Sequence, residues 1–149
     1  MDSNKANPEI YFHLGLGKVA STYLQYAFFP KLEGIHYIQR TRYRFTPGIV
    51  ASQPGNRFFV SREMDQQLEA EVIKFARHFP QTKAILLLRR HDSWIASQYR
   101  RHIKNGSPMS FKEFFDVDND QGWWPKKEVC FYDKIQIIEQ NFQLKQLII

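Results

Sequence analysis

The sequence predicts an α/β domain of three layers, in which helices cover both faces of a central parallel sheet. Two short apolar runs, residues 10–14 and 84–88, are typical of buried strands, and amphipathic helical patterns lie between them. Strands that alternate with helices favour parallel pairing. The 149 residues amount to one domain, and a hydrophobic content of 43% with 13 Phe is enough for its core.

The first strand is expected at Ile10–Leu14, directly before Gly15. A glycine-containing loop, Gly15–Lys18, leads into a helix expected from Ser21 to Phe29, and Pro30 would stop that helix. Residues 1–8 are polar and lack the hydrophobic segment of a signal peptide, so we expect a flexible N-terminus there.

Two further strands are expected at Ile35–Ile38 and Arg57–Val60. Between them, Arg40–Asn56 is basic and contains proline and glycine, which predicts a loop. Its Arg- and Tyr-rich beginning, Arg40–Phe45, has the composition to bind an anionic acceptor such as a polysaccharide, or a single-stranded nucleic acid, or to be a plain surface loop.

The second half begins with a helix expected over Asp65–Phe79, with Asp65 as its N-cap and apolar residues on one stripe. The run Ala84–Leu88 then predicts a central strand that is buried on both faces. Asp92 or Ser93 is expected to cap the next helix, which would run to about Lys104.

Three short patterns complete the chain. Ser110 and Glu113 fit a capping box that opens a short helix. Tyr132–Phe142 predicts an amphipathic helix, and Gln146–Ile149 a strand. Each pattern continues the alternation of helices and strands, so we expect one domain over residues 1–149.

Net charge and cysteine content indicate the class of ligand and the cellular compartment. The formal net charge of +6 favours an anionic ligand, which a phosphorylated cofactor or a sulfated glycan would satisfy without any nucleic acid. The single cysteine, Cys130, excludes a disulfide within the chain and fits a reducing compartment, so we expect a cytoplasmic protein. No apolar run is long enough to span a bilayer.

The loop after the first strand has the features of a phosphate site. Backbone N–H groups at a helix N-terminus point toward an anion, Lys18 adds a mobile positive charge, and Ser21 and Thr22 add hydroxyl donors. The Walker A pattern fails at two places, because Phe12 stands where its first glycine belongs and Val19 where its Mg²⁺-binding hydroxyl belongs. We therefore expect no bound metal.

The residues from Leu14 to Gln25 resemble the first signature of the sulfotransferases that use PAPS (3′-phosphoadenosine 5′-phosphosulfate). That signature reads Pro-Lys-[Ser/Thr]-Gly-Thr-[Thr/Ser]-aromatic-Leu and surrounds the 5′-phosphosulfate. The resemblance implies a P-loop NTPase-like fold and cofactor contacts from Gly17, Lys18, Val19, Ala20, Ser21, Thr22 and Tyr23. Gly17 replaces the family's proline, Val19 its Ser/Thr and Ala20 its glycine.

The segment from Ala84 to Arg100 is similar to the family's second signature, in which an arginine at a strand end and a serine eight positions later bind the cofactor's 3′-phosphate. Arg89 and Ser97 occupy those two positions here. A guanidinium at the carboxyl end of a strand, joined by a hydroxyl, suits a phosphate dianion. The neighbouring cations Arg100, Arg101 and Lys104 are better explained as a solvated helix face.

Sulfuryl transfer depends on positioning and charge stabilisation, so we expect Lys18 to neutralise the leaving phosphate. Glu63 is the expected base for the acceptor hydroxyl or amine, because it follows a predicted strand as an acidic residue does in many family members. A salt bridge with Arg62 would be the alternative role of Glu63, and His13 and His36 are the alternative bases.

Three functions remain open at this point. The first is a PAPS-dependent sulfotransferase that acts on a small-molecule or carbohydrate acceptor. The second is a non-catalytic or truncated domain that binds PAP (3′-phosphoadenosine 5′-phosphate), because family members continue to a basic loop over the 3′-phosphate and we expect this C-terminal part to be absent. The third is a P-loop kinase-like phosphotransferase, which Val19 disfavours.

Two other patterns are assigned to structure. The acidic loop 116–122 begins like a calcium loop but has Gln121 where the calcium loop needs glycine. Trp123 and Trp124 are better explained by packing than by an acceptor pocket.

Overall fold

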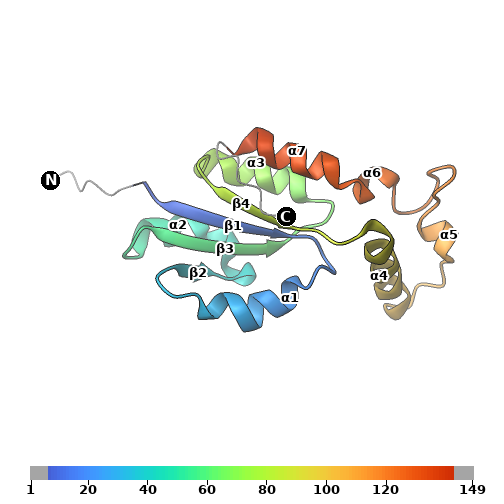
Figure 1. Cartoon of the computed structure of the whole chain (residues 1–149), viewed down its shortest axis with the longest axis horizontal. Helices are drawn as coiled ribbons and strands as arrows, with labels where there is room; N and C mark the ends of the chain where they lie inside the picture. Colours follow the sequence, from blue (N-terminus) through green and yellow to red (C-terminus); the bar gives the residue numbers. More distant parts are fainter. Residues whose placement is uncertain (1–6, 143–149) are drawn as a thin grey trace.

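The computed structural model describes residues 7–142, which form a four-stranded sheet with helices around it (Figure 1). The order in the sheet is β2-β3-β1-β4 and every pair is parallel. The strand bounds are β1 (Glu9–Gly15), β2 (His36–Ile38), β3 (Arg57–Glu63) and β4 (Lys83–Leu87). The predicted α/β class with a parallel sheet is confirmed.

Strand β1 lies between β3 and β4, and both pairings put its carboxyl end beside theirs. Gly15 is opposite Glu63 on one side and opposite Leu87 on the other. The segments that follow these three strands therefore leave the sheet at the same edge, which is where α/β proteins bind ligands.

One face of the sheet is covered by the helical segment after β1. It begins as α1 (Ser21–Tyr23) and continues through η1 (Leu24–Phe28) and η2 (Phe29–Lys31). Phe29 packs on this face, with its ring 4.6 Å from that of Phe59 and 4.9 Å from that of His13. Pro30 lies at the start of this last turn, where proline is tolerated, so the predicted end of the helix at Phe29 is two residues short.

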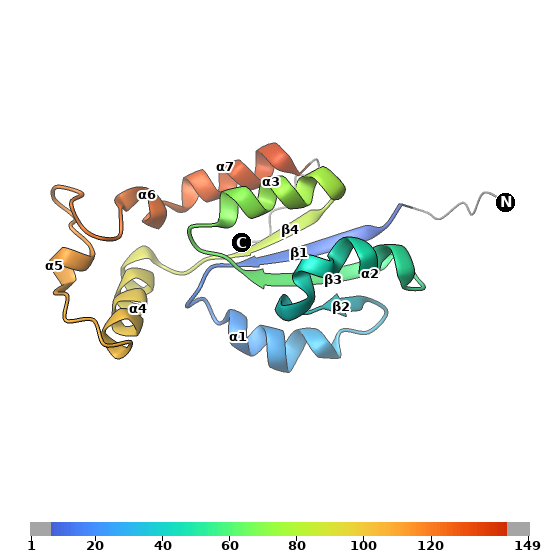
Figure 2. The same ribbon diagram turned by 180° about the vertical axis from the view of Figure 1, so that it is seen from behind.

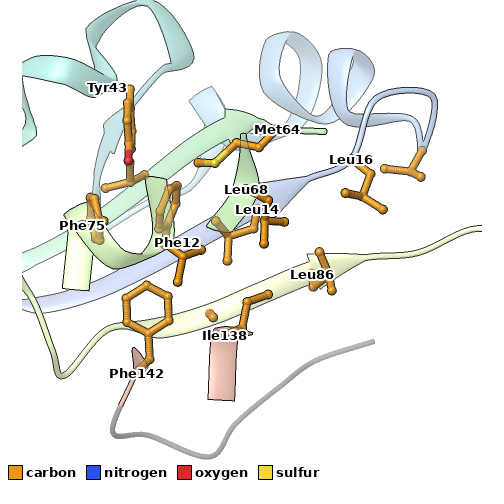
Figure 3. Close-up of a cluster of buried hydrophobic side chains, with 14 of the residues drawn as sticks. Phe12, Leu14, Leu16, Tyr43, Met64, Leu68, Phe75, Leu86, Ile138 and Phe142 are labelled. Atoms are coloured by element: carbon orange, nitrogen blue, oxygen red, sulfur yellow. The ribbon is translucent and has the colours of Figure 1, made fainter. Parts of the chain in front are cut away.

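The other face carries α2 (Thr46–Ser52), α3 (Leu68–His78) and α7 (Phe131–Asn141), and Figure 2 shows α3 and α7 side by side. The core lies between them and the sheet (Figure 3). Phe75 of α3 packs 4.4 Å from Phe12 of β1 and 6.4 Å from Phe142, centroid to centroid. The apolar stripe of α3 therefore faces β1 and packs on it through aromatic rings.

Helix α4 (His91–Lys104) extends beyond the carboxyl edge of the sheet, followed by α5 (Phe111–Phe114) and α6 (Lys126–Val129) (Figure 1). The predicted capping box is present, because Ser110 accepts from the Glu113 amide while the Glu113 side chain accepts from the Ser110 amide. Trp124 is buried against Trp94 at 5.6 Å, whereas Trp123 is half-exposed and packs on Phe114 at 5.8 Å. Both tryptophans therefore take part in ring packing, as expected.

The prediction of a loop over Arg40–Asn56 is wrong for residues 40–52 and holds for residues 53–56. Residues Arg40–Phe45 form the 3₁₀ helix η3, and α2 follows it directly. Tyr43, Ile49 and Val50 bury their side chains in the core of the α3 face, with Tyr43 stacked 5.5 Å from Phe12. This burial orders a segment whose proline and glycine suggest a loop.

Three expectations about the second half also need correction. Helix α3 begins at Leu68 after Gln67, so Asp65 is not its N-cap, and α4 begins at His91 after Arg90 rather than after Asp92 or Ser93. The strand expected to be central and buried on both faces is instead β4 at the edge of the sheet within residues 7–142, and its residues alternate between buried and partly exposed. The strand expected at Gln146–Ile149 and most of the flexible segment expected at 1–8 lie outside the described residues.

Candidate functional site

The loop between β1 and α1 is held from both sides by side chains from distant segments. The Gly17 amide donates to Asp65 Oδ1 at 2.9 Å, and its carbonyl accepts from Trp94 Nε1 at 2.8 Å. A Cβ on residue 17 would lie 2.9 Å from Asp65 Oδ2, so a larger residue there would displace this carboxylate from the loop. The loop is therefore anchored to both the β3–α3 connection and α4.

Two residues of this loop have a left-handed backbone although neither is glycine. Lys18 has φ 68° and Ala20, the N-cap of α1, has φ 64°. Each such residue costs about 1–2 kcal/mol relative to its preferred conformation. Between them, Val19 is buried in the core while Lys18 is exposed. The folded chain thus maintains a strained loop that keeps the lysine in solvent.

A cavity of about 420 Å³ opens at the carboxyl edge of the sheet, beside this loop. It brings together segments that follow β1, β3 and β4. Its lining residues are Gly17, Lys18, Ala20, Ser21, Thr22, Glu63, Arg89, Ser97 and Arg101.

Most of the predicted site residues are therefore neighbours, and Val19 and Tyr23 are the exceptions. Val19 is 8% exposed and packs in the core, whereas Tyr23 is 69% exposed on the outer side of α1. Neither residue lines the cavity. The buried Val19 gives the cavity no hydroxyl at the position where a Walker loop has one.

The hydroxyls of Ser21 and Thr22 are held differently. Ser21 is buried, and its Oγ donates to the Leu16 carbonyl at 3.3 Å, which stabilises the loop. Thr22 is exposed, and its Oγ1 donates to Glu63 Oε1 at 3.3 Å. Thr22 is therefore the more accessible donor of the two.

The second motif meets the first through Arg89. Its Nη1 donates to the Lys18 carbonyl at 3.2 Å, and its Nε donates to Ser93 Oγ at 2.7 Å. Ser97 lies further along α4 and lines the same cavity. A guanidinium from a strand end and a hydroxyl from a helix are thus held next to the lysine loop.

Arg101 is a cavity residue that the sequence assigned to a solvated face. It lies four residues after Ser97, one helical turn away, and its Nη2 is 3.7 Å from Asp65 Oδ2. The helical spacing from Ser97 is the signal that could have identified it. Asp65, predicted as a helix cap, instead contacts both Gly17 and Arg101.

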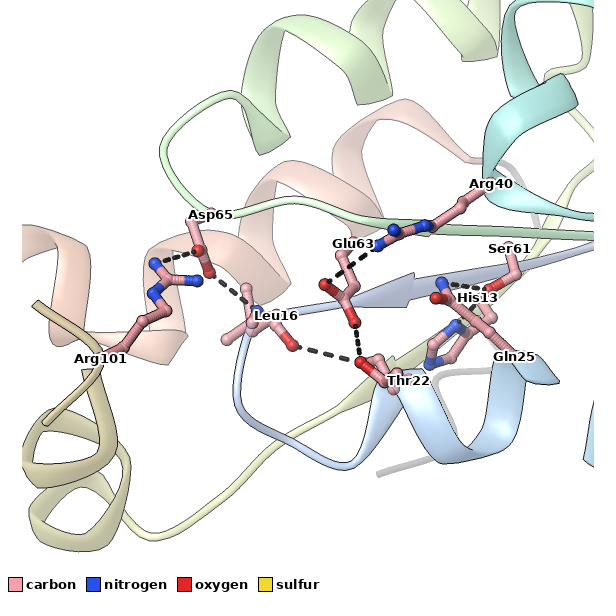
Figure 4. Close-up of polar contacts among 11 residues, drawn as sticks. His13, Leu16, Thr22, Gln25, Arg40, Ser61, Glu63, Asp65 and Arg101 are labelled. Atoms are coloured by element: carbon pink, nitrogen blue, oxygen red, sulfur yellow. Dashed lines mark hydrogen bonds and ion pairs between the residues drawn. The ribbon is translucent and has the colours of Figure 1, made fainter. Parts of the chain in front are cut away.

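Glu63 ends β3 and lines the cavity, and Figure 4 shows its carboxylate between Thr22 and Arg40. Its Oε2 lies 4.0 Å from Arg40 Nη1. The expected alternative, a salt bridge with Arg62, is not formed, because Arg62 lies 3.8 Å from Glu71 Oε2 on the other side of the strand. Successive strand residues point to opposite faces, which separates the two side chains.

The histidines do not reach the cavity. His13 is fully buried, its Nδ1 lies 2.9 Å from Ser61 Oγ, and burial lowers the pKa of its imidazole to about 4. Gln25 of η1 donates to the same serine at 3.0 Å, so this group fastens the first helix to the sheet. His36 is half-buried on β2 with its ring 5.9 Å from that of Phe58. Of the three bases considered, Glu63 lines the cavity.

Cations dominate the charge of this cavity. Lys18, Arg89 and Arg101 line it, against one acidic lining residue, Glu63. A concave site with excess positive charge attracts anions. Over residues 7–142, no cluster of three or more His, Cys, Asp or Glu side chains has an arrangement suited to a metal ion.

Comparisons with known proteins add no assignment. No protein-family model, curated protein or solved structure matches the chain. In the part of the chain that the structure describes, no helix has the length and apolar character needed to cross a membrane.

Proposed function

We propose that this chain is a sulfotransferase that moves a sulfuryl group from PAPS to a hydroxyl or amine of a small-molecule or carbohydrate acceptor. One observation carries the proposal: Lys18 and Thr22 from the first motif and Arg89 and Ser97 from the second line a single cavity of about 420 Å³. Two sets of phosphate-binding groups in one cavity suit a nucleotide with phosphates at both its 5′ and 3′ positions.

The arrangement around β1 also supports a P-loop-like mode of binding. The loop joins the central strand to a helix, and Ala20 at the N-cap gives the first amides of that helix no side-chain acceptor. These amides and Lys18 would bind the 5′-phosphosulfate, and Arg89 with Ser97 would bind the 3′-phosphate.

The reaction would be an in-line displacement at sulfur. The acceptor oxygen or nitrogen forms a bond to sulfur, the bond between sulfur and the 5′-phosphate oxygen breaks, and that oxygen leaves with its electron pair as PAP. Lys18 would stabilise the charge that develops on the leaving phosphate. Glu63 would take the proton from the acceptor. Thr22, which donates to Glu63, would orient the carboxylate.

A non-catalytic PAP-binding domain is the second candidate, and a specific contact favours it. The Gly17 N–H donates to the Asp65 carboxylate, so this amide is not available as a donor to a phosphate. An ATP-dependent phosphotransferase is less well supported, because Val19 is buried where a Walker loop has its Mg²⁺ hydroxyl. A cytoplasmic location remains a prediction from the single cysteine.

Calorimetry followed by a turnover assay tests the proposal. The purified chain should bind PAP more tightly than ATP with Mg²⁺, and it should release PAP from PAPS when a mixture of phenolic, amine and carbohydrate acceptors is present. PAP binding without acceptor-dependent release would favour the non-catalytic domain. Preferential binding of Mg-ATP would refute the sulfotransferase.

A further inference from the structure

The cavity has an aromatic and basic rim on the side of Glu63, formed by Tyr26 and Arg40. Tyr26 is 59% exposed and lies four residues after Thr22, a lining residue of the cavity whose hydroxyl donates to Glu63. Arg40 comes from η3 and places its Cζ 6.0 Å from the centroid of the Tyr26 ring.

Arg40 connects this rim to Glu63. Its Nη1 is 4.0 Å from Glu63 Oε2, at the outer limit of an ion pair, and the two side chains are 45% and 26% exposed. Pairs of this kind hold their partners weakly. Arg40 is thus a cation that an incoming anion can recruit, whereas Lys18 and Arg89 belong to the proposed nucleotide site.

We propose that this rim binds the acceptor and that the acceptor is an anionic saccharide, an inference that rests on the proposed sulfotransferase function. The ring of Tyr26 offers a flat, exposed face against which a sugar ring packs. Arg40 provides a planar fork for a carboxylate or sulfate on the same sugar. A neighbouring sugar hydroxyl would then lie at Glu63.

The geometry also couples acceptor binding to Glu63. When the acceptor anion draws Arg40 to itself, Glu63 loses the cation at 4.0 Å. The Glu63 carboxylate is then left to accept a hydrogen bond from the acceptor hydroxyl.

A single-stranded nucleic acid fits this rim less well. Its binding requires a continuous cationic track with free aromatic faces. Glu63 stands beside Arg40, and further along η3 the guanidinium of Arg44 covers the ring of Phe45 at 4.6 Å. The mixed charge and the exposed tyrosine beside Arg40 fit an acidic sugar better than a nucleic-acid strand.

The test uses an unsulfated chondroitin tetrasaccharide, with neutral chitotetraose and an oligothymidylate of equal charge as comparisons. The chain should bind chondroitin most tightly in calorimetry. Arg40→Ala should weaken that binding about tenfold, the equivalent of about 1.4 kcal/mol, and Tyr26→Ala several-fold. Arg77→Ala, an exposed arginine at the end of α3, is the matched control for lost charge and should bind like the unmodified chain.

A double-mutant cycle tests the coupling. Glu63→Gln should tighten tetrasaccharide binding several-fold, because the amide no longer attracts Arg40, and the gain should vanish in Arg40→Ala/Glu63→Gln. A purely structural role for either residue predicts no such reversal. Thermal melts of each variant establish that it is folded.

The outcomes separate the rim from the proposed reaction. Equal losses in Arg40→Ala and Arg77→Ala, tighter Arg40-dependent binding of oligothymidylate, or PAP binding without any tetrasaccharide binding would each overturn the rim as a saccharide site. Tetrasaccharide binding that depends on Arg40, in a chain that binds no PAP, would support the rim and refute the sulfotransferase.

Discussion

The two edges of the sheet contain similar charged residues but organise them in opposite ways. At the amino edge, Glu9 accepts from Lys83 and Arg57 and from the Tyr11 hydroxyl. At the carboxyl edge, Lys18 and Arg89 face a cavity. The same side-chain types therefore stabilise the sheet at one edge and form a candidate binding site at the other.

The two edges differ in how far their charged side chains are balanced by neighbouring partners. The hydrogen bonds from Lys83 and Tyr11 lower the pKa of Glu9 to about 2, so the cluster already satisfies its carboxylate. The carboxyl edge has an excess of cations and two non-glycine residues with positive φ, Lys18 and Ala20. Strain and unbalanced charge at the same place are typical of a functional site.

The largest expected difference concerns the two lysines. Lys18→Ala should reduce PAPS turnover about a hundredfold to a thousandfold, because it removes the charge that stabilises the leaving phosphate, and it should leave the fold intact. Lys83→Ala should keep turnover and PAP binding and lower only stability. Steady-state kinetics with thermal melts measures both. Unchanged turnover in Lys18→Ala would remove the functional distinction between the edges.

The two glutamates are expected to differ next. Glu63→Gln should lower kcat about a hundredfold by removing the base, while the Kd for PAP in calorimetry stays the same. Glu9→Gln is the matched control and should retain kcat. A Glu63→Gln variant with normal kcat would assign Glu63 to structure.

A smaller effect is expected from the arginines. Arg89→Ala should weaken PAP binding about tenfold to a hundredfold, since a charge-assisted contact to the 3′-phosphate is lost. Binding of adenosine 5′-phosphosulfate, which has no 3′-phosphate, should not change. Arg57→Ala at the amino edge should affect neither ligand. Equal losses for both nucleotides would place Arg89 elsewhere than at the 3′-phosphate.

The Glu9 cluster at the amino edge should make the free energy of unfolding depend on pH. The pKa of Glu9 in the folded chain lies below its ordinary value of 4.5, so its contribution is present above that value and is lost as the pH falls toward about 2. Urea unfolding between pH 6 and pH 2 should show this loss in the unmodified chain, by less than about 1 kcal/mol because the cluster is largely exposed. Glu9→Gln should lack that component, and identical pH profiles would contradict the assignment.

The smallest effect concerns loop strain. Ala20→Gly should relieve the left-handed backbone at φ 64°, while glycine adds freedom to the unfolded chain. The net gain in the free energy of unfolding should be below about 1 kcal/mol in urea titrations. Ala51→Gly in α2 has no such strain to relieve and should destabilise by a similar amount. Destabilisation by Ala20→Gly would show that the loop is not strained.

Much of the fold could be predicted from the sequence because the patterns are local. The strands around Ile10–Leu14 and Ala84–Leu88 and the Ser110 capping box depend on neighbouring residues, and they formed close to their expected positions. The prediction of a loop at Arg40–Asn56 failed for its helical part because Tyr43 is buried against β1 and α3, which are distant in the sequence. Such contacts cannot be predicted from the composition of the segment alone.

The candidate site divides in the same way. The sequence by itself determined which groups are available: the lysine of a glycine-containing loop, the Arg89 and Ser97 pair, and a glutamate at a strand end. The tertiary structure alone decided that Arg101 joins them, that Glu63 has Arg40 rather than Arg62 as its neighbour, and that Asp65 anchors the loop at Gly17. The reason is physical, because parallel pairing aligns the carboxyl ends of β1, β3 and β4 and so brings together residues that the chain keeps far apart.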